Sequence, residues 1–259
     1  MEFYKFDGAG NDFVVVDNRE GRYALSVEEI VRICHRRFGI GADGLMTLEN
    51  STLEGFDFEM KYYNSDGRLG SMCGNGGRCI SAFAHMLGMG KKLRFMGFDG
   101  PHEAEVLLWD QHVGLVKLGM RDVAVTEVNR CLDGWFLDTG SPHYVQRVND
   151  LQQFDVVGEG RRLRHMTDLF PEGTNVDFIE DLPDGRLAVR TYERGVEDET
   201  WACGTGVTAS AIVSGNHRLV ARGGDFRVDF EADGQHYRQV FLTGPVSLNF
   251  TGSWTSSAQ

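Results

Sequence analysis

The chain has 259 residues, of which 41% are hydrophobic and 25% are charged, a balance typical of a globular protein with one large or two ordinary domains. A net charge of −12 disfavours nucleic-acid and anionic-membrane partners, and no apolar run approaches the ~20 residues that span a bilayer. Five cysteines at irregular spacing argue against a disulfide framework, and the first residues do not resemble a secretory signal. We therefore expect a cytoplasmic protein with reduced thiols.

Short hydrophobic runs alternate with glycine-rich turns and predict a strand-rich chain. The first predicted helix, residues 26–37, begins at Ser26, which has Glu29 at capping-box spacing. Further helices are predicted at residues 76–87 and 206–214. Strands are predicted at residues 13–16, 56–63, 93–98, 103–108, 113–118, 135–139, 176–180, 187–192, 226–230 and 239–242.

Two segments of the chain resemble each other. Cys73 is followed by Gly-Asn-Gly, and Cys203, 130 positions later, is followed by Gly-Thr-Gly. Residues 8–13 likewise resemble residues 140–145 at an offset of 132. These near-constant offsets predict an internal duplication. We expect one subdomain over residues 1–118 and a second over 119–245, with residues from about 246 to 259 packing back on the first and ending in a loose tail from Gly252.

Each cysteine stands just before a helix-like run whose first residues are glycines. Such a position brings a thiol to the N–H groups of a helix N-terminus, where a thiolate is favoured and a carboxylate can bind. One thiol could then remove a proton and the other return it. The alternative is that both cysteines are small buried hydrophobic residues. No Cys-x2-Cys or Cys-x4-Cys pair exists, so we expect no metal site.

The second cysteine is preceded by a loop with two opposite charges, Glu193 and Arg194. A carboxylate and a guanidinium on one loop can hold the ammonium and carboxylate groups of an amino acid. An ordinary surface ion pair is the alternative interpretation.

Two stretches of the chain resemble the two signatures of the diaminopimelate epimerase family. The first is Asn-Ser-Asp-Gly at residues 64–67 with Cys-Gly-Asn-Gly-Gly-Arg-Cys at 73–79. The second is Tyr-Glu-Arg-Gly at 192–195 with Glu-Thr at 199–200 and Ala-Cys-Gly-Thr-Gly at 202–206. Residues 8–13 resemble the family's N-terminal segment, and the resemblance extends to about Pro245. It implies an α+β fold of two pseudo-symmetric subdomains, each a curved, mainly antiparallel sheet around a central helix.

The resemblance also implies a function: the cofactor-independent interconversion of LL- and meso-2,6-diaminopimelate, in lysine and peptidoglycan precursor biosynthesis. Cys73 and Cys203 would be the two catalytic thiols, and His143 matches a family histidine near them. The substrate contacts that it implies are Asn11, Asn64, Gly74, Asn75, Asn175, Glu193, Arg194, Gly204 and Thr205.

Two positions depart from the best-known bacterial pattern of this family. Gly44 stands where a substrate-contacting glutamine is frequent, and Ser141 stands where an asparagine is usual. Ser141 can still donate a hydrogen bond, whereas Gly44 offers no side chain. These two substrate contacts are the ones that the sequence leaves open.

Two other functions compete with this one. A proline-type or other amino-acid racemase would share the fold, but proline racemases resemble Cys-Gly-His at the first cysteine, where this chain has Asn75. A dithiol redox protein would cycle Cys73 and Cys203 to a disulfide. The chain has only five lysines, none near a motif, so we expect no Schiff-base cofactor. The expected partner is a small amino-acid substrate, and the sequence leaves a homodimer open.

Overall fold

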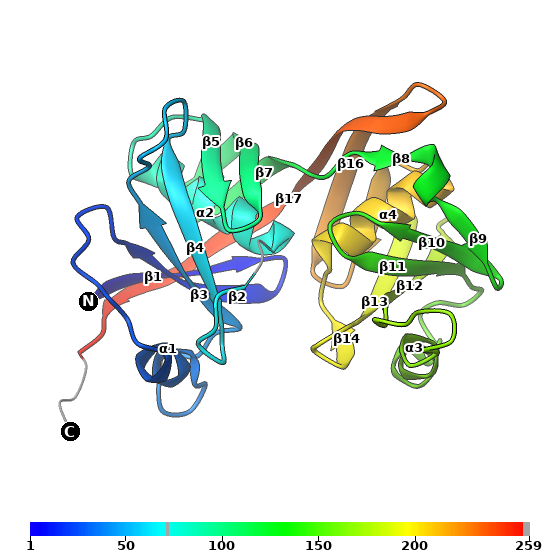
Figure 1. Ribbon diagram of the computed structural model, residues 1–259, viewed down its shortest axis with the longest axis horizontal. Helices are drawn as coiled ribbons and strands as arrows, with labels where there is room; N and C mark the ends of the chain where they lie inside the picture. Colours follow the sequence, from blue (N-terminus) through cyan, green and yellow to red (C-terminus); the bar gives the residue numbers. More distant parts are fainter. Residues whose placement is uncertain (71–72, 256–259) are drawn as a thin grey trace. The chain divides into compact units, whose positions relative to one another are not determined.

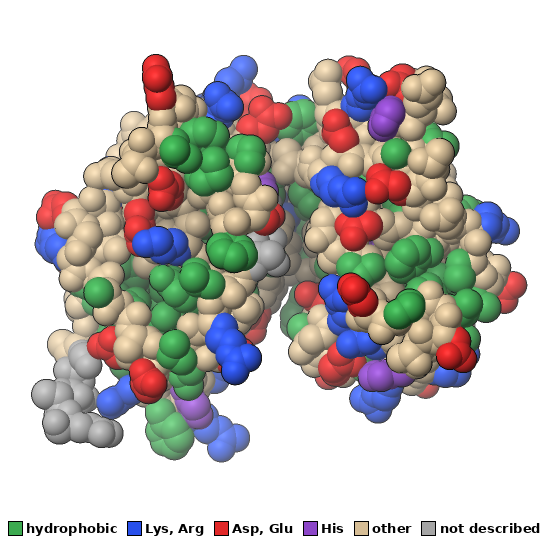
Figure 2. All heavy atoms as spheres, viewed as in Figure 1, with side chains coloured by type: hydrophobic (Ala, Val, Ile, Leu, Met, Phe, Trp, Pro, Cys, Tyr) green, Lys and Arg blue, Asp and Glu red, His purple; other side chains and the backbone are tan. Residues whose placement is uncertain are grey.

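The computed structural model describes residues 1–70 and 73–255 (Figure 1). Its contacts divide the chain into an N-terminal unit, Met1–Leu118 with Pro245–Gln259, and a C-terminal unit, Gly119–Gly244. Within the described residues, no helix is both long enough and apolar enough to cross a membrane. On the face drawn in Figure 2, acidic and basic side chains are intermingled on both units.

The N-terminal unit is a closed sheet around one helix. Its strands are β1 (Glu2–Gly8), β2 (Asn11–Asp17), β3 (Gly44–Glu49), β4 (Phe58–Asn64), β5 (Lys92–Gly97), β6 (Gly100–Asp110), β7 (Val113–Gly119) and part of β17 (His236–Ser253). Consecutive strands from β1 to β7 pair with each other, in parallel at β2–β3 and β4–β5 and antiparallel elsewhere. Because β17 pairs with both β1 and β7, the ring of strands closes.

Helix α2 (Gly74–Met86) lies among these strands and contacts β1, β2, β3 and β6. All residues from 74 to 84 are buried, which is why this helix is rich in glycine and alanine. Helix α1 (Val27–Cys34) packs outside the ring, with Ile30 and Ile33 against Val14 and Leu45.

The predicted capping box of α1 is confirmed, but the helix ends three residues earlier than predicted. Ser26 accepts from the Glu29 N–H at 3.2 Å, and the Glu29 carboxylate accepts from the Ser26 N–H at 2.9 Å. His35 then leaves the helical conformation. Its Nδ1 accepts from the N–H groups of Arg37 and Phe38, both at 3.1 Å, and this turn replaces the next helical hydrogen bonds.

The C-terminal unit repeats the same order of elements. Its members are β8 (Val123–Ala124), the 3₁₀ turn Val125–Glu127, β9 (Asn129–Cys131), β10 (Gly134–Asp138), β11 (Pro142–Arg147), α3 (Val156–Arg164), β12 (Asn175–Asp181), β13 (Leu187–Glu193), β14 (Asp198–Thr200), α4 (Gly204–Ser214), β15 (Arg218–Ala221), β16 (Gly224–Ala232) and part of β17. The parallel pairs are β11–β12 and β13–β15, which correspond to β2–β3 and β4–β5. Helix α3 corresponds to α1 and the central helix α4 to α2, so the predicted pseudo-symmetric fold is confirmed.

The sequence analysis missed α3 because this helix owes little to intrinsic propensity. It contains two glycines, Gly158 and Gly160. Asp155 caps it by accepting from the Gly158 N–H at 2.9 Å. A Cβ at Gly160 would lie 2.4 Å from the Cβ of Tyr192, so this glycine allows the helix to pack closely on β13.

The loose tail predicted from Gly252 is wrong for the first residues of that segment. Gly252 and Ser253 belong to β17 and lie opposite Phe3 and Glu2 of β1, a strand that the sequence analysis did not identify. The backbone of Trp254 continues the pairing, because its N–H donates to Met1 O at 2.7 Å. Residues 256–259 lie outside the described part of the chain.

A network of ion pairs connects the strands of the N-terminal unit near the start of β2. Asp12 accepts from the buried ammonium of Lys5 and from Arg36, whose Nη2 lies 2.7 Å from Oδ1. Arg36 also donates to Asp43 at 2.6 Å, and the other oxygen of Asp43 accepts from the Asn11 amide at 2.6 Å. The network therefore fixes the side chain of Asn11.

Asp12 should make stability depend on pH. Burial raises its pKa, but hydrogen bonds from Arg36 and Lys5 outweigh this and lower the pKa from 3.8 to about 2. The stabilisation that a depressed pKa provides is fully present above about pH 4 and is lost as the pH falls toward 2. We expect Asp12→Asn to cost about 2 kcal/mol in the free energy of unfolding at neutral pH, measured by urea titration.

The control is Asp17→Asn, which breaks a surface pair with Arg19 whose side chains are each 31% exposed. This variant should lose less than about 1 kcal/mol. A gap between wild type and Asp12→Asn that stays constant down to about pH 2 would contradict the assignment.

Candidate active site

Each central helix begins at one of the two cysteines. Cys73 is the N-cap of α2 (φ −94°, ψ 129°) and Cys203 is the N-cap of α4 (φ −109°, ψ 113°), so the two thiols occupy equivalent backbone positions. The first N–H groups of a helix have no partner within it and carry the positive end of the helix dipole. Both cysteines thus stand beside a preformed binding position for an anion.

In the N-terminal unit, Cys73 lies beside two asparagines. Its Sγ and the amide nitrogen of Asn75 both lie 3.5 Å from Oδ1 of Asn11. Asn11 comes from the start of β2 and is held by Asp43, as described above. The structure therefore brings together Asn11, Cys73 and Asn75, as the sequence predicted.

A fully buried arginine, Arg78, donates hydrogen bonds to the residues that directly follow Cys73. Arg78 donates from Nη2 to Asn75 Oδ1 at 2.8 Å and from Nη1 to Gly74 O at 3.3 Å. It therefore fixes the first turn of α2, directly after Cys73. Burial lowers its pKa, and the thiols of Cys79 and Cys73 act in the opposite direction. Cys79 is itself fully buried, which raises its pKa well above 9.0 and leaves it a thiol without access to solvent.

Gly44 and Asn64 lie side by side on neighbouring strands, where Gly44 of β3 pairs with Asn64 of β4. A Cβ at Gly44 would lie 2.5 Å from the ring of Tyr62 and 2.7 Å from Tyr63 O. The tyrosine ring therefore occupies the space of a side chain at position 44. A glutamine contact like the one that relatives make from this position is not available in this chain.

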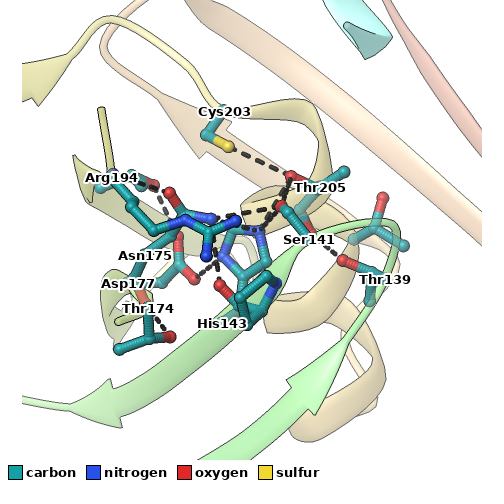
Figure 3. Close-up of polar contacts among 12 residues, drawn as sticks. Thr139, Ser141, His143, Thr174, Asn175, Asp177, Arg194, Cys203 and Thr205 are labelled. Atoms are coloured by element: carbon teal, nitrogen blue, oxygen red, sulfur yellow. Dashed lines mark hydrogen bonds and ion pairs between the residues drawn. The ribbon is translucent and has the colours of Figure 1, made fainter. Parts of the chain in front are cut away.

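In the C-terminal unit, Thr205 connects Cys203 to His143 of β11 and to Ser141, which directly precedes that strand (Figure 3). Its hydroxyl lies 3.3 Å from Cys203 Sγ, 2.8 Å from His143 Nε2 and 3.1 Å from Ser141 Oγ. Thr139 donates to the backbone oxygen of Thr205 at 2.8 Å. Ser141 is thus within the cluster and retains a hydroxyl at the position where asparagine is usual in relatives.

Asn175, at the start of β12, forms hydrogen bonds both to the loop after β13 and to the residues around Thr205. Its Oδ1 accepts from the Arg194 N–H at 2.8 Å, and its Nδ2 donates to Pro142 O at 3.0 Å and to Ser141 Oγ at 3.2 Å. Arg194 donates from Nη1 to Glu172 O at 3.1 Å. Glu193, the last residue of β13, lies close enough to Cys203 to affect its ionisation.

At Cys203, burial opposes the stabilisation of a thiolate that is expected at a helix N-terminus. Cys203 is only 8% exposed, and burial raises its pKa well above 9.0. The carboxylates of Glu193 and Asp177 raise it further, whereas hydrogen bonding with Thr205 and with the Gly206 N–H has a smaller, opposite effect. Desolvation therefore outweighs the helix terminus, and Cys203 is a thiol at neutral pH.

Comparison with known proteins identifies the family. The family model described as diaminopimelate epimerase matches residues 3–120 and 135–248. The chain belongs to the diaminopimelate epimerase family. A protein named diaminopimelate epimerase from Chlorobaculum tepidum is 50% identical over 262 residues, which cover 96% of this chain and 99% of that protein. One from Flavobacterium psychrophilum is 42% identical over 261 residues, covering 96% and 98%.

Solved structures with a similar fold include more distant enzymes. A probable proline racemase from Agrobacterium radiobacter matches with a TM-score of 0.71 at 13% identity, covering 98% of this chain and 92% of that one. A phenazine biosynthesis protein from Bacillus anthracis matches with a TM-score of 0.70 at 13% identity, covering 99% of each chain. At such low identity these matches show the fold alone.

Two residues of these clusters were not predicted from the sequence. Arg78 falls inside a family signature, yet its contact with the Asn75 side chain was not foreseen. Asp177 is a charged residue within a run of buried hydrophobic residues, and it contacts His143 at 2.6 Å. A lone carboxylate in such a run is the signal that could have identified it, because buried charges are rare unless they have partners.

The protonation state of Cys203 can be tested through Glu193. Replacing Glu193 by Gln removes a negative charge that raises the pKa of this thiol. Since iodoacetamide reacts with the thiolate, alkylation of Cys203 at about pH 7.5 should become several-fold faster. The rate is read by mass spectrometry of the Cys203 peptide. Glu231→Gln, an exposed change on β16, is the control and should leave the rate unchanged, and an unchanged rate in Glu193→Gln would refute the electrostatic argument.

Proposed function

We propose that this protein interconverts LL- and meso-2,6-diaminopimelate, a step of lysine and peptidoglycan precursor biosynthesis. Membership in the family and 42–50% identity to relatives of that name over nearly the full chain support the substrate. The observation that carries the chemistry is the pair of cysteine-capped central helices, one in each unit. Such a pair supplies two acid–base groups in equivalent settings.

The substrate would be bound by groups of both clusters. The backbone N–H groups of Gly74, Asn75, Gly204 and Thr205 are suited to the carboxylate at the reacting carbon, because they lie in the first turns of α2 and α4. The remaining polar groups are suited to the rest of the substrate, including its distal amino-acid end. They are Asn11, Asn64, Asn175, Glu193 and Arg194.

The proposed mechanism uses one thiolate and one thiol on opposite faces of the α-carbon. The thiolate takes the α-proton, so that an S–H bond forms as the C–H bond breaks and the electron pair remains on the carbon. The other thiol then gives its proton to the opposite face and keeps the electron pair on sulfur. The raised pKa of Cys203 makes it the proton-bearing partner in the resting enzyme. Both thiols must be reduced, which fits a cytoplasmic enzyme.

The alternatives have weaker support. The substrate of a proline-type racemase has no charged distal end, and Asn75 here is held by Arg78 in the first turn of α2. A redox role for the two cysteines would not require the hydrogen-bonded cluster around Thr205. Exchange at the α-carbon distinguishes the three functions.

The test is epimerisation of LL-diaminopimelate in deuterium oxide. We expect deuterium at the α-carbon together with formation of the meso isomer, followed by NMR and chiral chromatography. Cys73→Ala and Cys203→Ala should each lower kcat by 10²–10⁴-fold or more, because one face then has no proton carrier.

Cys131→Ala is the matched control, because Cys131 lies on β9, away from both clusters, and should retain wild-type kcat. Circular dichroism shows whether each variant is folded. A folded Cys203→Ala protein with wild-type turnover would refute the two-thiol mechanism, and absence of exchange in the wild type would refute the epimerase function.

A further inference from the structure

Asp177 is a fully buried carboxylate with two hydrogen-bond partners, both from neighbouring strands. Its Oδ2 lies 2.6 Å from His143 Nδ1 on β11, and its Oδ1 accepts from Thr191 Oγ1 on β13 at 2.7 Å. A Cβ at Gly206 would lie 2.2 Å from Oδ1, so the glycine of the Cys-Gly-Thr-Gly segment leaves room for this carboxylate at the start of α4. Burying a carboxylate is costly unless it is paired and hydrogen-bonded, so a specific role is expected for it.

The hydrogen bonds around His143 determine which ring nitrogen carries the proton. An ionised carboxylate only accepts, so Nδ1 must donate to Asp177. Asn175 gives independent evidence for the other nitrogen. Its Oδ1 accepts from the Arg194 N–H and its Nδ2 donates to Pro142 O, which fixes the orientation of the amide. The same Nδ2 lies 3.4 Å from His143 Nε2, and in the Nδ1–H tautomer Nε2 is the nitrogen that accepts.

With Nε2 as an acceptor, the hydroxyls of Thr205 at 2.8 Å and Ser141 at 3.1 Å both lie within hydrogen-bond distance of it, and the shorter contact favours Thr205 as the donor. The Thr205 hydroxyl, 2.8 Å away, donates to Nε2. Because this hydroxyl has one proton only, its oxygen faces Cys203 as an acceptor. The thiol of Cys203 therefore donates to Thr205 at 3.3 Å, and the series runs from Cys203 through Thr205 and His143 to Asp177 (Figure 3).

We propose, building on the epimerase function above, that Asp177 is a positioning residue that fixes His143 as the Nδ1–H tautomer and thereby holds Cys203 as the proton donor. The carboxylate touches neither the thiol nor any group that we assign to the substrate. It acts through His143 and Thr205, in the way that the buried carboxylate of a catalytic triad orients its histidine. In turnover the S–H bond of Cys203 breaks toward the α-carbon, and the electron pair stays on sulfur.

The matched position in the N-terminal unit is built differently. The residue two positions after Cys73 is Asn75, which is bound to the guanidinium of Arg78 rather than to a histidine and carboxylate. The residue two positions after each thiol thus has a different supporting group, a guanidinium for Asn75 and a histidine with a carboxylate for Thr205, although the backbone positions of the two thiols are equivalent. This difference is what would make Cys203 the donor in the resting enzyme.

The tautomer can be measured in the unmodified protein. In the full chain with ¹⁵N-labelled histidine, we expect Nδ1 of His143 to carry the proton, and His143→Gln assigns its signals. In Asp177→Asn the amide can donate to Nδ1, and the proton should move to Nε2. A wild-type His143 protonated at Nε2 would overturn the proposal, whether or not the variant folds.

Kinetics test whether the tautomer matters for catalysis. Asp177→Asn should lower kcat for LL-diaminopimelate by roughly 10²-fold or more, while KM changes less than about threefold, because the substrate-binding amides and Arg194 are retained. Ser210→Ala, on the same helix, is the control. Its buried hydroxyl has no hydrogen-bond partner among the described residues, so the loss of that hydroxyl should leave kcat unchanged.

The outcomes separate this proposal from the function on which it rests. An active wild type together with a folded Asp177→Asn enzyme of wild-type kcat would overturn only the role of Asp177. A wild type that exchanges no α-proton would overturn the epimerase function, and the proposed role in catalysis with it.

Discussion

The first N–H groups of a helix have no hydrogen-bond partner within the helix. In this protein the two central helices, α2 and α4, both begin directly after a cysteine. Each central helix is buried among strands, so its first turn cannot be solvated on all sides. The backbone amides at that turn must be satisfied by a ligand or by ordered groups, and this requirement places a thiol and an anion-binding position together.

The two units place their cysteines at equivalent backbone positions but surround them with different side chains. In the N-terminal unit a buried guanidinium, Arg78, holds the first helical turn after the cysteine. In the C-terminal unit the carboxylates of Asp177 and Glu193 act on Cys203 and favour its neutral form. A two-base reaction needs one thiolate and one thiol at the start of each turnover. Two cysteines in identical surroundings would have no reason to differ in protonation, whereas these surroundings differ in charge.

The fold by itself does not determine the substrate. A proline racemase and a phenazine biosynthesis protein share this architecture at 13% identity. The substrate must therefore be argued from local features of this chain: Asn75 with its partner Arg78, and the loop of Glu193 and Arg194 anchored by Asn175.

The sequence by itself determined the duplication, the two cysteine caps and most of the residues grouped around them, because these depend on contiguous motifs and on spacing. It also predicted three of the four helices, while α3 was missed because Asp155 and the packing of Gly160 on Tyr192 stabilise it rather than helix propensity. Only the tertiary structure decided that the Tyr62 ring fills the space beside Gly44 and that Asp177 lies against His143, 34 residues away. It also showed that burial and nearby carboxylates raise the pKa of Cys203, against the effect of the helix N-terminus. The pKa of a thiol depends on how completely the fold removes water and which charges it brings near, and neither can be read from the residues adjacent in the chain.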